Sequence, residues 1–273
     1  MPELVIEKVD ASLGALVQGL DLRDPLAAEQ VLALREALFE HQVLFLRRQE
    51  LNDDQHLGFA EQFGTPCLYP LVEMLGGTKP IENVADGGER KPVAGSWHTD
   101  VTWLQDPPKI GVLNALVMPE EGGDTLWCDL YSVYDALPSE LRDRVADLIV
   151  GHSPGQGFYK NVVAPLGDES FLDRFKARYG DGSRHPLVCD HYVTGRRLLY
   201  LAGGFMDHVE GMEVAEGRSL LRELMAFASQ TRFHVQWEWQ AGDVAIWDER
   251  STMHRVDTSH WPAPREMRRC TVS

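Results

Sequence analysis

A change of hydrophobic period near the carboxyl end of the chain constrains the fold more than any other feature. In residues 233–239, FHVQWEW, every second side chain is large and apolar and the residues between are polar. This alternation predicts a strand with one buried face. The segment AGD at 241–243 predicts a turn, and VAIWD at 244–248 predicts the next strand. Strands of this kind favour a barrel or a sandwich.

The rest of the chain mixes helical and strand patterns. Apolar strands are expected over 43–47 and 108–118. Helices are expected over 27–41, over 52–64 with Asn52 as N-cap and Gln55 three residues on, over 139–150 after Pro138, and over 217–230. No glycine-rich phosphate loop is present, which argues against a nucleotide fold. Together these patterns predict an α+β protein.

Composition limits the partners. The 26 Lys and Arg against 42 Asp and Glu give a formal charge of −16, so the protein should repel nucleic acid and anionic membranes. An anionic ligand would need a local arginine cluster. The four cysteines form no CxxC pair and are expected as reduced thiols. The amino-terminal residues resemble no signal peptide, and no apolar run has membrane-spanning length, so we expect a cytoplasmic protein.

The stretch GSWHTDVTW at 95–103 contains the first chemical candidates. On a strand, His98 and Asp100 would point to the same face and could share a metal ion. His254, just after the strand at 244–248, could supply a third ligand, and two histidines with one carboxylate suit non-haem iron. The alternative is that His98 and Asp100 are polar residues on the solvent-exposed face of a strand. A second such pair, His208 and Glu210, is expected next to a helix start and is interpreted as structural or surface.

Arginines near the carboxyl end form the second candidate. Arg265 and Arg269 lie four residues apart, and Arg265 would share a strand face with Met267. In an acidic protein such a cluster is either a solvated edge or a clamp for a carboxylate, whose geometry the guanidinium matches. Two glycines at 122–123 predict a turn, after which Thr125 begins a strand. Thr125 alone could be an ordinary strand residue.

Taken together, the motifs resemble the TauD/TfdA family of Fe(II)- and 2-oxoglutarate-dependent dioxygenases. The resemblance covers nearly the whole chain. It rests on LGALVQGLDLRDPL and EHQVLFLRRQELNDDQHLGFAEQFG in the amino-terminal part, and then, in the family's order, on WHTDVTW, PPKIGVLNA, GGDTLW, YDALP, HPLV, TGRRLLYL, GDVAIWD and TMHRVD. It implies a single domain over 1–273 with a double-stranded β-helix (a cupin-like jelly roll) and flanking helices.

The resemblance also implies roles for individual residues. His98, Asp100 and His254 match the iron ligands. Arg265 and Thr125 match the residues that bind the distal carboxylate of 2-oxoglutarate, and Arg269 matches an arginine near its C1 carboxylate and the anionic group of the substrate. Phe158 and Phe205 match aromatic walls of the substrate pocket. The implied cofactors are Fe(II), 2-oxoglutarate and O₂, and the implied reaction couples substrate hydroxylation to formation of succinate and CO₂. When the attacked carbon bears a heteroatom, hydroxylation leads to cleavage of that bond.

Several positions depart from the taurine enzymes of the family. Tyr69, Val72 and Ala94 stand where those enzymes have a histidine, a tyrosine and an asparagine that bind taurine, and Glu249 replaces an asparagine. We attribute these changes to a different substrate and expect taurine to be a poor substrate. A small anion with an apolar or aromatic body, its anionic group meeting Arg269, is the expected substrate.

Alternatives remain at this point. Desaturation, epoxidation or cyclisation could follow from the same cofactors. A catalytically silent jelly-roll binding protein would lack a ligand or the oxoglutarate arginine, and neither is missing. A zinc hydrolase would need a general base beside the metal and leaves Arg265 and Thr125 without a role. We also expect a homo-oligomer, either a dimer or a tetramer.

Overall fold

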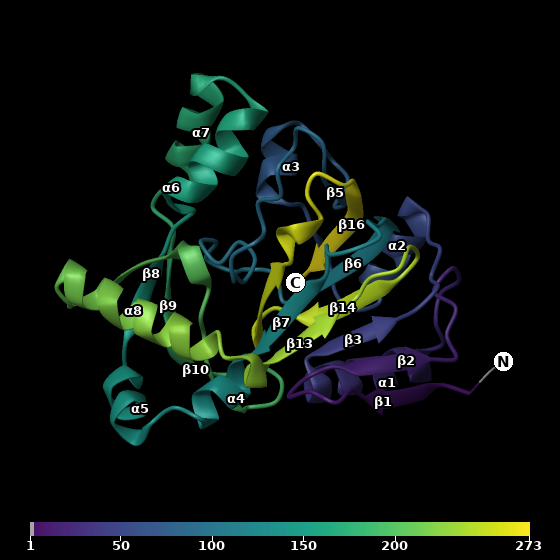
Figure 1. Cartoon of the computed structure of the whole chain (residues 1–273), viewed down its shortest axis with the longest axis horizontal. Coiled ribbons are helices and arrows are strands. Elements are labelled where there is room, and N and C mark those ends of the chain that lie inside the picture. The colour runs from purple at the N-terminus through teal and green to yellow at the C-terminus, as the bar shows by residue number, and fades with distance from the viewer. Residues whose placement is uncertain (1–2) are drawn as a thin grey trace.

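The computed structural model describes residues 3–273 and contains sheets with flanking helices (Figure 1). The largest sheet has eight strands in the order β1-β2-β3-β14-β6-β16-β4, and β5 also pairs with β16. A second sheet has the order β13-β7-β15. The strands of the large sheet are β1 (Val5–Lys8), β2 (Ala15–Gln18), β3 (Val43–Leu46), β4 (Pro66–Cys67), β5 (Glu82–Asp86), β6 (Ile110–Val117), β14 (Val244–Asp248) and β16 (Arg265–Val272). Those of the second are β7 (Thr125–Asp129), β13 (His234–Trp237) and β15 (Thr252–Val256).

These two sheets share an aromatic core. Phe45 of β3 stacks on Trp237 of β13 with ring centroids 4.2 Å apart, and Trp127 of β7 contacts Trp247 of β14 at 6.0 Å. All four side chains are buried. The large sheet therefore packs on the second sheet through rings whose burial provides much of the hydrophobic stabilisation.

Helices cover the opposite face of the large sheet. The helices α1 (Ala28–His41) and α2 (Asp53–Glu61) bury Leu34, Leu38 and Phe59 against the aliphatic residues of β2, β3, β6 and β14. In Figure 1 α1 lies behind β1 and β2, on the side where the chain begins. The helix α2 begins with the predicted capping box, because Asn52 and Gln55 bond each other's main-chain N–H groups.

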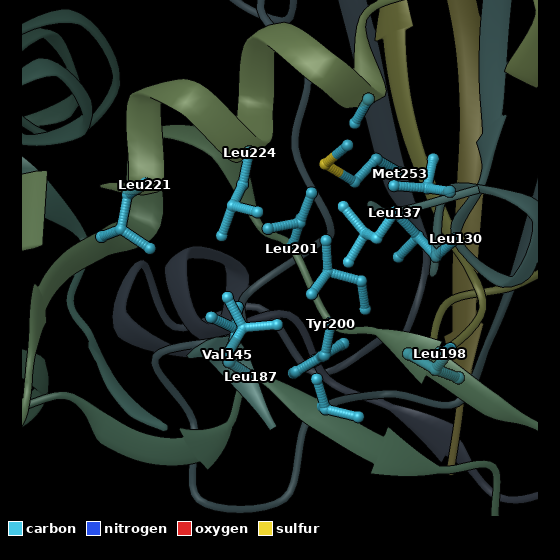
Figure 2. Packing of buried hydrophobic residues seen from close by; sticks show 14 of the residues in the cluster. Leu130, Leu137, Val145, Leu187, Leu198, Tyr200, Leu201, Leu221, Leu224 and Met253 are labelled. Atoms are coloured by element: carbon cyan, nitrogen blue, oxygen red, sulfur yellow. The ribbon is translucent and has the colours of Figure 1, made fainter. Parts of the chain in front are cut away.

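A second core lies beside the sheets, under the helix α8 (Val214–Ala228) (Figure 2). Leu221 and Leu224 of α8 face Tyr200, Leu201 and other buried residues. This core also includes α4 (Leu130–Asp135), α5 (Ser139–Val145) and the small sheets formed by β8 (Ile149–His152), β9 (Ser183–Pro186) and β12 (Met206–Val209), and by β10 (Val188–Asp190) and β11 (Arg197–Leu199).

The remaining short elements gather at the end of the molecule where β5 lies (Figure 1). They are α3 (Pro70–Met74), α6 (Gly155–Phe158), the π-helix Tyr159–Val163, the 3-10 helix Ala164–Leu166 and α7 (Glu169–Tyr179). Leu71, Trp103, Phe171 and Phe175 join them in one apolar cluster. Further 3-10 turns are Gly203–Phe205, Thr231–Phe233 and Thr258–His260. None of the helices between residues 3 and 273 is both long and apolar enough to cross a membrane.

Most expected elements are confirmed. The alternating strand expected over 233–239 is shorter, since β13 spans His234–Trp237 and Phe233 ends a 3-10 turn, but its apolar residues are buried as expected. Two helix ends also differ. The helix expected over 139–150 ends at Val145, and Ile149 begins β8, because a short apolar run such as LIV fits either structure and here completes a sheet. The helix expected to reach Gly64 ends at Glu61. The four cysteines are free thiols.

Candidate functional site

Two histidines and an aspartate from distant parts of the sequence converge beside β15, an edge strand of the second sheet. His98, Asp100 and His254 each offer one ligand atom, and these atoms lie within 4.8 Å of one another. His254 belongs to β15, and its main chain forms an isolated bridge with His98. The two N–H···O bonds of this bridge are 3.0 and 2.8 Å long. The main chain itself therefore sets both imidazoles side by side.

The expectation that His98 and Asp100 lie on one strand was wrong. Apart from the single bridge at His98, residues 95–101 form irregular structure that turns at Asp100, and Val101 has φ of 44°. A β-branched residue adopts such a conformation only when its surroundings impose it. Thr99 supplies part of that constraint, since its buried hydroxyl lies 3.0 Å from the carbonyl oxygens of both Leu201 and Thr252.

Both imidazoles offer a ring nitrogen to the candidate metal site. The Nδ1 of His98 lies 2.7 Å from the carbonyl oxygen of Ser96, so this nitrogen donates, and Nε2 faces Asp100 at 3.8 Å. The Nδ1 of His254 is buried without a hydrogen-bond partner among residues 3–273. Burial, with the nearby His98, lowers the pKa of His254 to about 3, so its ring is neutral at pH 7.

Arg265 is buried at one end of β16 without a carboxylate in contact. Its Nε donates to the carbonyl oxygen of Gly123 at 2.8 Å, and Nη2 lies 3.4 Å from the hydroxyl of Thr125. It forms no ion pair with any carboxylate of residues 3–273, although only 2% of it is exposed. Burial lowers its pKa to about 10, so it is still charged at pH 7. The Thr125 hydroxyl also accepts a hydrogen bond from Trp239 at 2.9 Å.

Arg269, four residues along the same strand, is in the opposite situation. Its Nη1 donates to Asp100, while Nε and Nη2 donate to Oε2 of Glu82 at 3.0 and 2.6 Å. The ring of Tyr69 lies 4.9 Å from its guanidinium carbon. Burial alone would raise the pKa of Asp100, but Arg269 together with His254 and His98 holds that pKa below its ordinary value. Asp100 is therefore ionised at pH 7.

Glu249 lies behind Asp100 and does not form a substrate wall. Its Oε2 accepts a hydrogen bond from the main-chain N–H of Asp100 at 3.3 Å, and only 1% of the residue is exposed. Its Oε1 is buried without a hydrogen-bond partner in the described part of the chain. Burial and the charge of Asp100 raise the pKa of Glu249 well above its ordinary value. The attribution of this change to the substrate was therefore wrong, because the side chain supports a candidate metal ligand.

Aromatic side chains border the histidines. The ring centroid of Phe205 is 6.3 Å from that of His98. Trp103 contacts both expected walls, with ring centroids 4.6 Å from Phe205 and 4.8 Å from Phe158. Gly203 lets the turn that carries Phe205 approach the main chain before His98, because it has φ of 57° and a Cβ there would lie 1.7 Å from the carbonyl oxygen of Trp97. An aromatic surface therefore lies directly beside the candidate metal ligands.

The other expected pocket residues are less closely tied to this centre. Val72 packs against Gly77, and the carbonyl of Ala94 accepts a hydrogen bond from Val256, two residues beyond His254. Their place in the substrate pocket stays a prediction. His208, expected beside a helix start, lies within β12 and bonds Asp207 at 3.1 Å on the half-exposed surface.

Sequence reasoning missed two residues of the site. Trp103 lies within the WHTDVTW motif, but its sequence context predicts no role for it. Glu82 was not singled out, although the acids at 82 and 86 have the same four-residue spacing as the arginines at 265 and 269. That signal becomes readable only when β5 is known to pair with β16, where Glu82 faces Arg269 and Asp86 faces Arg265.

Two imidazoles and one carboxylate form the donor set of mononuclear non-haem iron oxygenases. The chain matches the family model described as "Taurine catabolism dioxygenase TauD, TfdA family" over residues 6–271, and it belongs to this family. The protein is an Fe(II)- and 2-oxoglutarate-dependent dioxygenase, and its co-substrates are 2-oxoglutarate and O₂.

Similar proteins agree with this membership. The chain is 34% identical to the alpha-ketoglutarate-dependent sulfate ester dioxygenase of Pseudomonas putida, over 99% of this chain and 90% of that protein. It is 32% identical to the alpha-ketoglutarate-dependent 2,4-dichlorophenoxyacetate dioxygenase of Cupriavidus pinatubonensis, over 94% and 93%. The crystal structure of AAD-2 in complex with Mn(II) and N-oxalylglycine superimposes with a TM-score of 0.83 at 30% identity, covering 99% of this chain and 96% of that one.

Proposed function

We propose that His98, Asp100 and His254 bind the Fe(II) of this dioxygenase. Three observations support the fit of an iron ion. The ligand atoms lie within 4.8 Å of one another, the ring of His254 is neutral, and Asp100 is ionised. Three protein ligands leave open positions for a bidentate co-substrate and O₂. Bound there, iron with 2-oxoglutarate and O₂ supplies the oxidising chemistry, and decarboxylation of 2-oxoglutarate yields succinate and CO₂.

Arg265 is the observation that carries the 2-oxoglutarate assignment. A buried cation with no carboxylate in direct contact is costly, and an anionic ligand bound to it reduces that cost. The carboxylate of 2-oxoglutarate far from the metal fits this position, since a guanidinium binds carboxylates in two parallel hydrogen bonds. The Thr125 hydroxyl accepts bonds from Trp239 and Arg265, so its own hydrogen is available for the same carboxylate.

For the substrate we propose a small organic anion with an apolar or aromatic body. The similar enzymes named above act on sulfate esters and on 2,4-dichlorophenoxyacetate. The rings of Trp103, Phe158 and Phe205 offer an apolar surface beside His98, and Arg269 offers a cation near Asp100. Hydroxylation at a carbon bound to oxygen would cleave the C–O bond. Because Tyr69, Val72 and Ala94 replace the taurine-binding residues, taurine is expected to be poor. Desaturation, epoxidation or cyclisation are alternative outcomes.

The remaining expectations belong to the same proposal. The two sheets with their shared aromatic core are proposed to be the double-stranded β-helix of a single domain over 1–273. The enzyme is proposed to act in the cytoplasm as a homo-oligomer, a dimer or a tetramer, without binding nucleic acid or membranes. The formal charge of −16 supports the last point.

The first test is spectroscopic and anaerobic. Apo-protein, Fe(II) and 2-oxoglutarate should together give the weak visible charge-transfer band of chelated 2-oxoglutarate. The band should disappear in His254→Ala and persist in His208→Ala, a matched histidine removal on the surface. Succinate release should then rise with aromatic or alkyl anions and not with taurine. If the folded, iron-loaded protein gives no band, the silent binding protein or the zinc hydrolase becomes the better interpretation. Tightly coupled turnover of taurine would contradict the substrate proposal.

A further inference from the structure

Glu82 occupies the edge of Arg269 that Asp100 leaves open. Both Nε and Nη2 of Arg269 donate to Oε2 of Glu82, at 3.0 and 2.6 Å, and Nη1 donates to Asp100. A guanidinium binds an oxyanion best through two adjacent N–H groups. The edge carrying Nε and Nη2 is such a pair, and Glu82 already fills it.

The strand pairing makes this contact part of the fold. Glu82 of β5 and Arg269 of β16 are directly opposed in the antiparallel register, in a run of five such pairs that ends with Asp86 opposite Arg265. Cross-strand neighbours of this kind lie within reach of each other's side chains. Glu82 is thus held at Arg269 by its position on the strand.

Glu82 is also the outermost member of the cluster. Its side chain is 25% exposed, against 13% for Arg269 and 6% for Asp100. One cation is shared between two carboxylates, so the three groups together carry a charge of −1. An incoming anion meets repulsion as long as Glu82 remains at Arg269.

We infer that Glu82 is a specificity-determining residue, a built-in counter-ion that the anionic group of the substrate must displace from Arg269. The inference rests on the proposed anionic substrate. Because Glu82 is the more exposed partner, it can move outward while Asp100 stays bound to Arg269. Anions that bind a guanidinium more weakly than this carboxylate fail to displace it, and the site discriminates against them.

The test compares charge at residue 82 with charge on the ligand. Wild type and Glu82→Gln are loaded with Mn(II) and N-oxalylglycine, which prevents turnover, and titrated calorimetrically with phenoxyacetate and with its neutral counterpart phenoxyethanol. Glutamine keeps an oxygen that can accept from Arg269, so the variant should fold. Phenoxyacetate should bind Glu82→Gln at least tenfold more tightly than wild type, and phenoxyethanol should bind both proteins equally.

Glu266→Gln is the matched control. Glu266 lies on β16, accepts a hydrogen bond from Asn83 at 2.7 Å and does not contact Arg269. This substitution therefore removes the same charge without freeing the arginine. It should leave both affinities unchanged. Equal or weaker binding of phenoxyacetate to Glu82→Gln, or no binding to either protein, would overturn the inference. The proposed function is measured separately, by 2-oxoglutarate consumption of the iron enzyme, so its failure would be distinguishable.

Discussion

Arg265 and Arg269 lie four residues apart on one face of β16, but their electrostatic surroundings are opposite. Arg265 is buried against a carbonyl and a hydroxyl, with no carboxylate of residues 3–273 in an ion pair with it. Arg269 is held between Asp100 and Glu82. The comparison shows that the counter-ions already beside an arginine, and not the residue type alone, decide what it can bind. Arg265 can bind an added anion directly, whereas at Arg269 a carboxylate must leave before another anion can bind.

The largest expected effect is at the Arg265 end. Arg265→Met should raise the Kd for 2-oxoglutarate about 1000-fold, because it removes two charge-assisted hydrogen bonds worth roughly 1.5–3 kcal/mol each. The ligand-free variant should be about 1 kcal/mol more stable, since an unpaired buried cation is gone. Titration of the visible band and urea unfolding measure the two quantities. Arg268→Met, which removes an arginine paired with Asp53, should leave the Kd unchanged. A less stable Arg265→Met would break the comparison.

Arg269→Met should have the opposite effect on stability. Removing the cation leaves Asp100 and Glu82 facing each other, and the free energy of unfolding should fall by about 3 kcal/mol at pH 7. Arg269 holds the pKa of Asp100 below its ordinary value of 3.8, and without the arginine burial raises it. Asp100 of the variant then takes up a proton as the pH falls toward 4, so the difference from wild type should shrink. Unfolding in urea at pH 7, 5.5 and 4.5 tests this, and a constant difference would contradict it.

Glu249→Gln tests which acids at the Arg269 end are charged. Burial raises the pKa of Glu249 above its ordinary value of 4.5. The folded protein therefore keeps this proton at pH values where the unfolded chain has lost it. The resulting stability is present below pH 4.5 and is lost as the pH rises through the folded pKa. The free energy of unfolding of Glu249→Gln has no such decrease. Relative to wild type it should therefore rise by up to about 1.4 kcal/mol per pH unit above pH 4.5. Parallel stability curves for the two proteins from pH 5 to 8 would show that Glu249 is ionised.

The smallest effect is expected from Thr125→Val at the Arg265 end. Loss of one hydroxyl should raise the Kd for 2-oxoglutarate about tenfold, equivalent to about 1.4 kcal/mol. It should also cost about 1 kcal/mol of stability, since the indole N–H of Trp239 loses its acceptor. Thr125→Ser restores the hydroxyl and should return both values close to wild type. An unchanged Kd in Thr125→Val would leave Arg265 as the sole ligand of that carboxylate.

Local patterns in the sequence predicted the parts of the fold that depend on local physics. The alternation at 233–239 set the buried face of β13, and Asn52 with Gln55 set the start of α2, because these signals act within a few residues. The boundary at 149–152 was missed, since a short apolar run is decided by the sheet that it joins.

The candidate site shows the same division. Motif order identified His98, Asp100 and His254, and the structure brings their ligand atoms together. The irregular backbone at Asp100 could not be predicted, because the constraint on it includes the contacts of Thr99 with Leu201 and Thr252, both distant in sequence. The pairing of Arg269 with Glu82 depends on strand register across 187 residues, which no local pattern contains.

The bridge between His98 and His254 has a consequence for how the enzyme handles metals. The reciprocal main-chain bonds fix the two histidine backbones relative to each other and involve no metal ligand atom, so binding of an ion has little backbone entropy to overcome. A preformed site of this kind ranks divalent ions by their general affinity series, with copper above iron, and the supply of ions in the cell decides which one is bound.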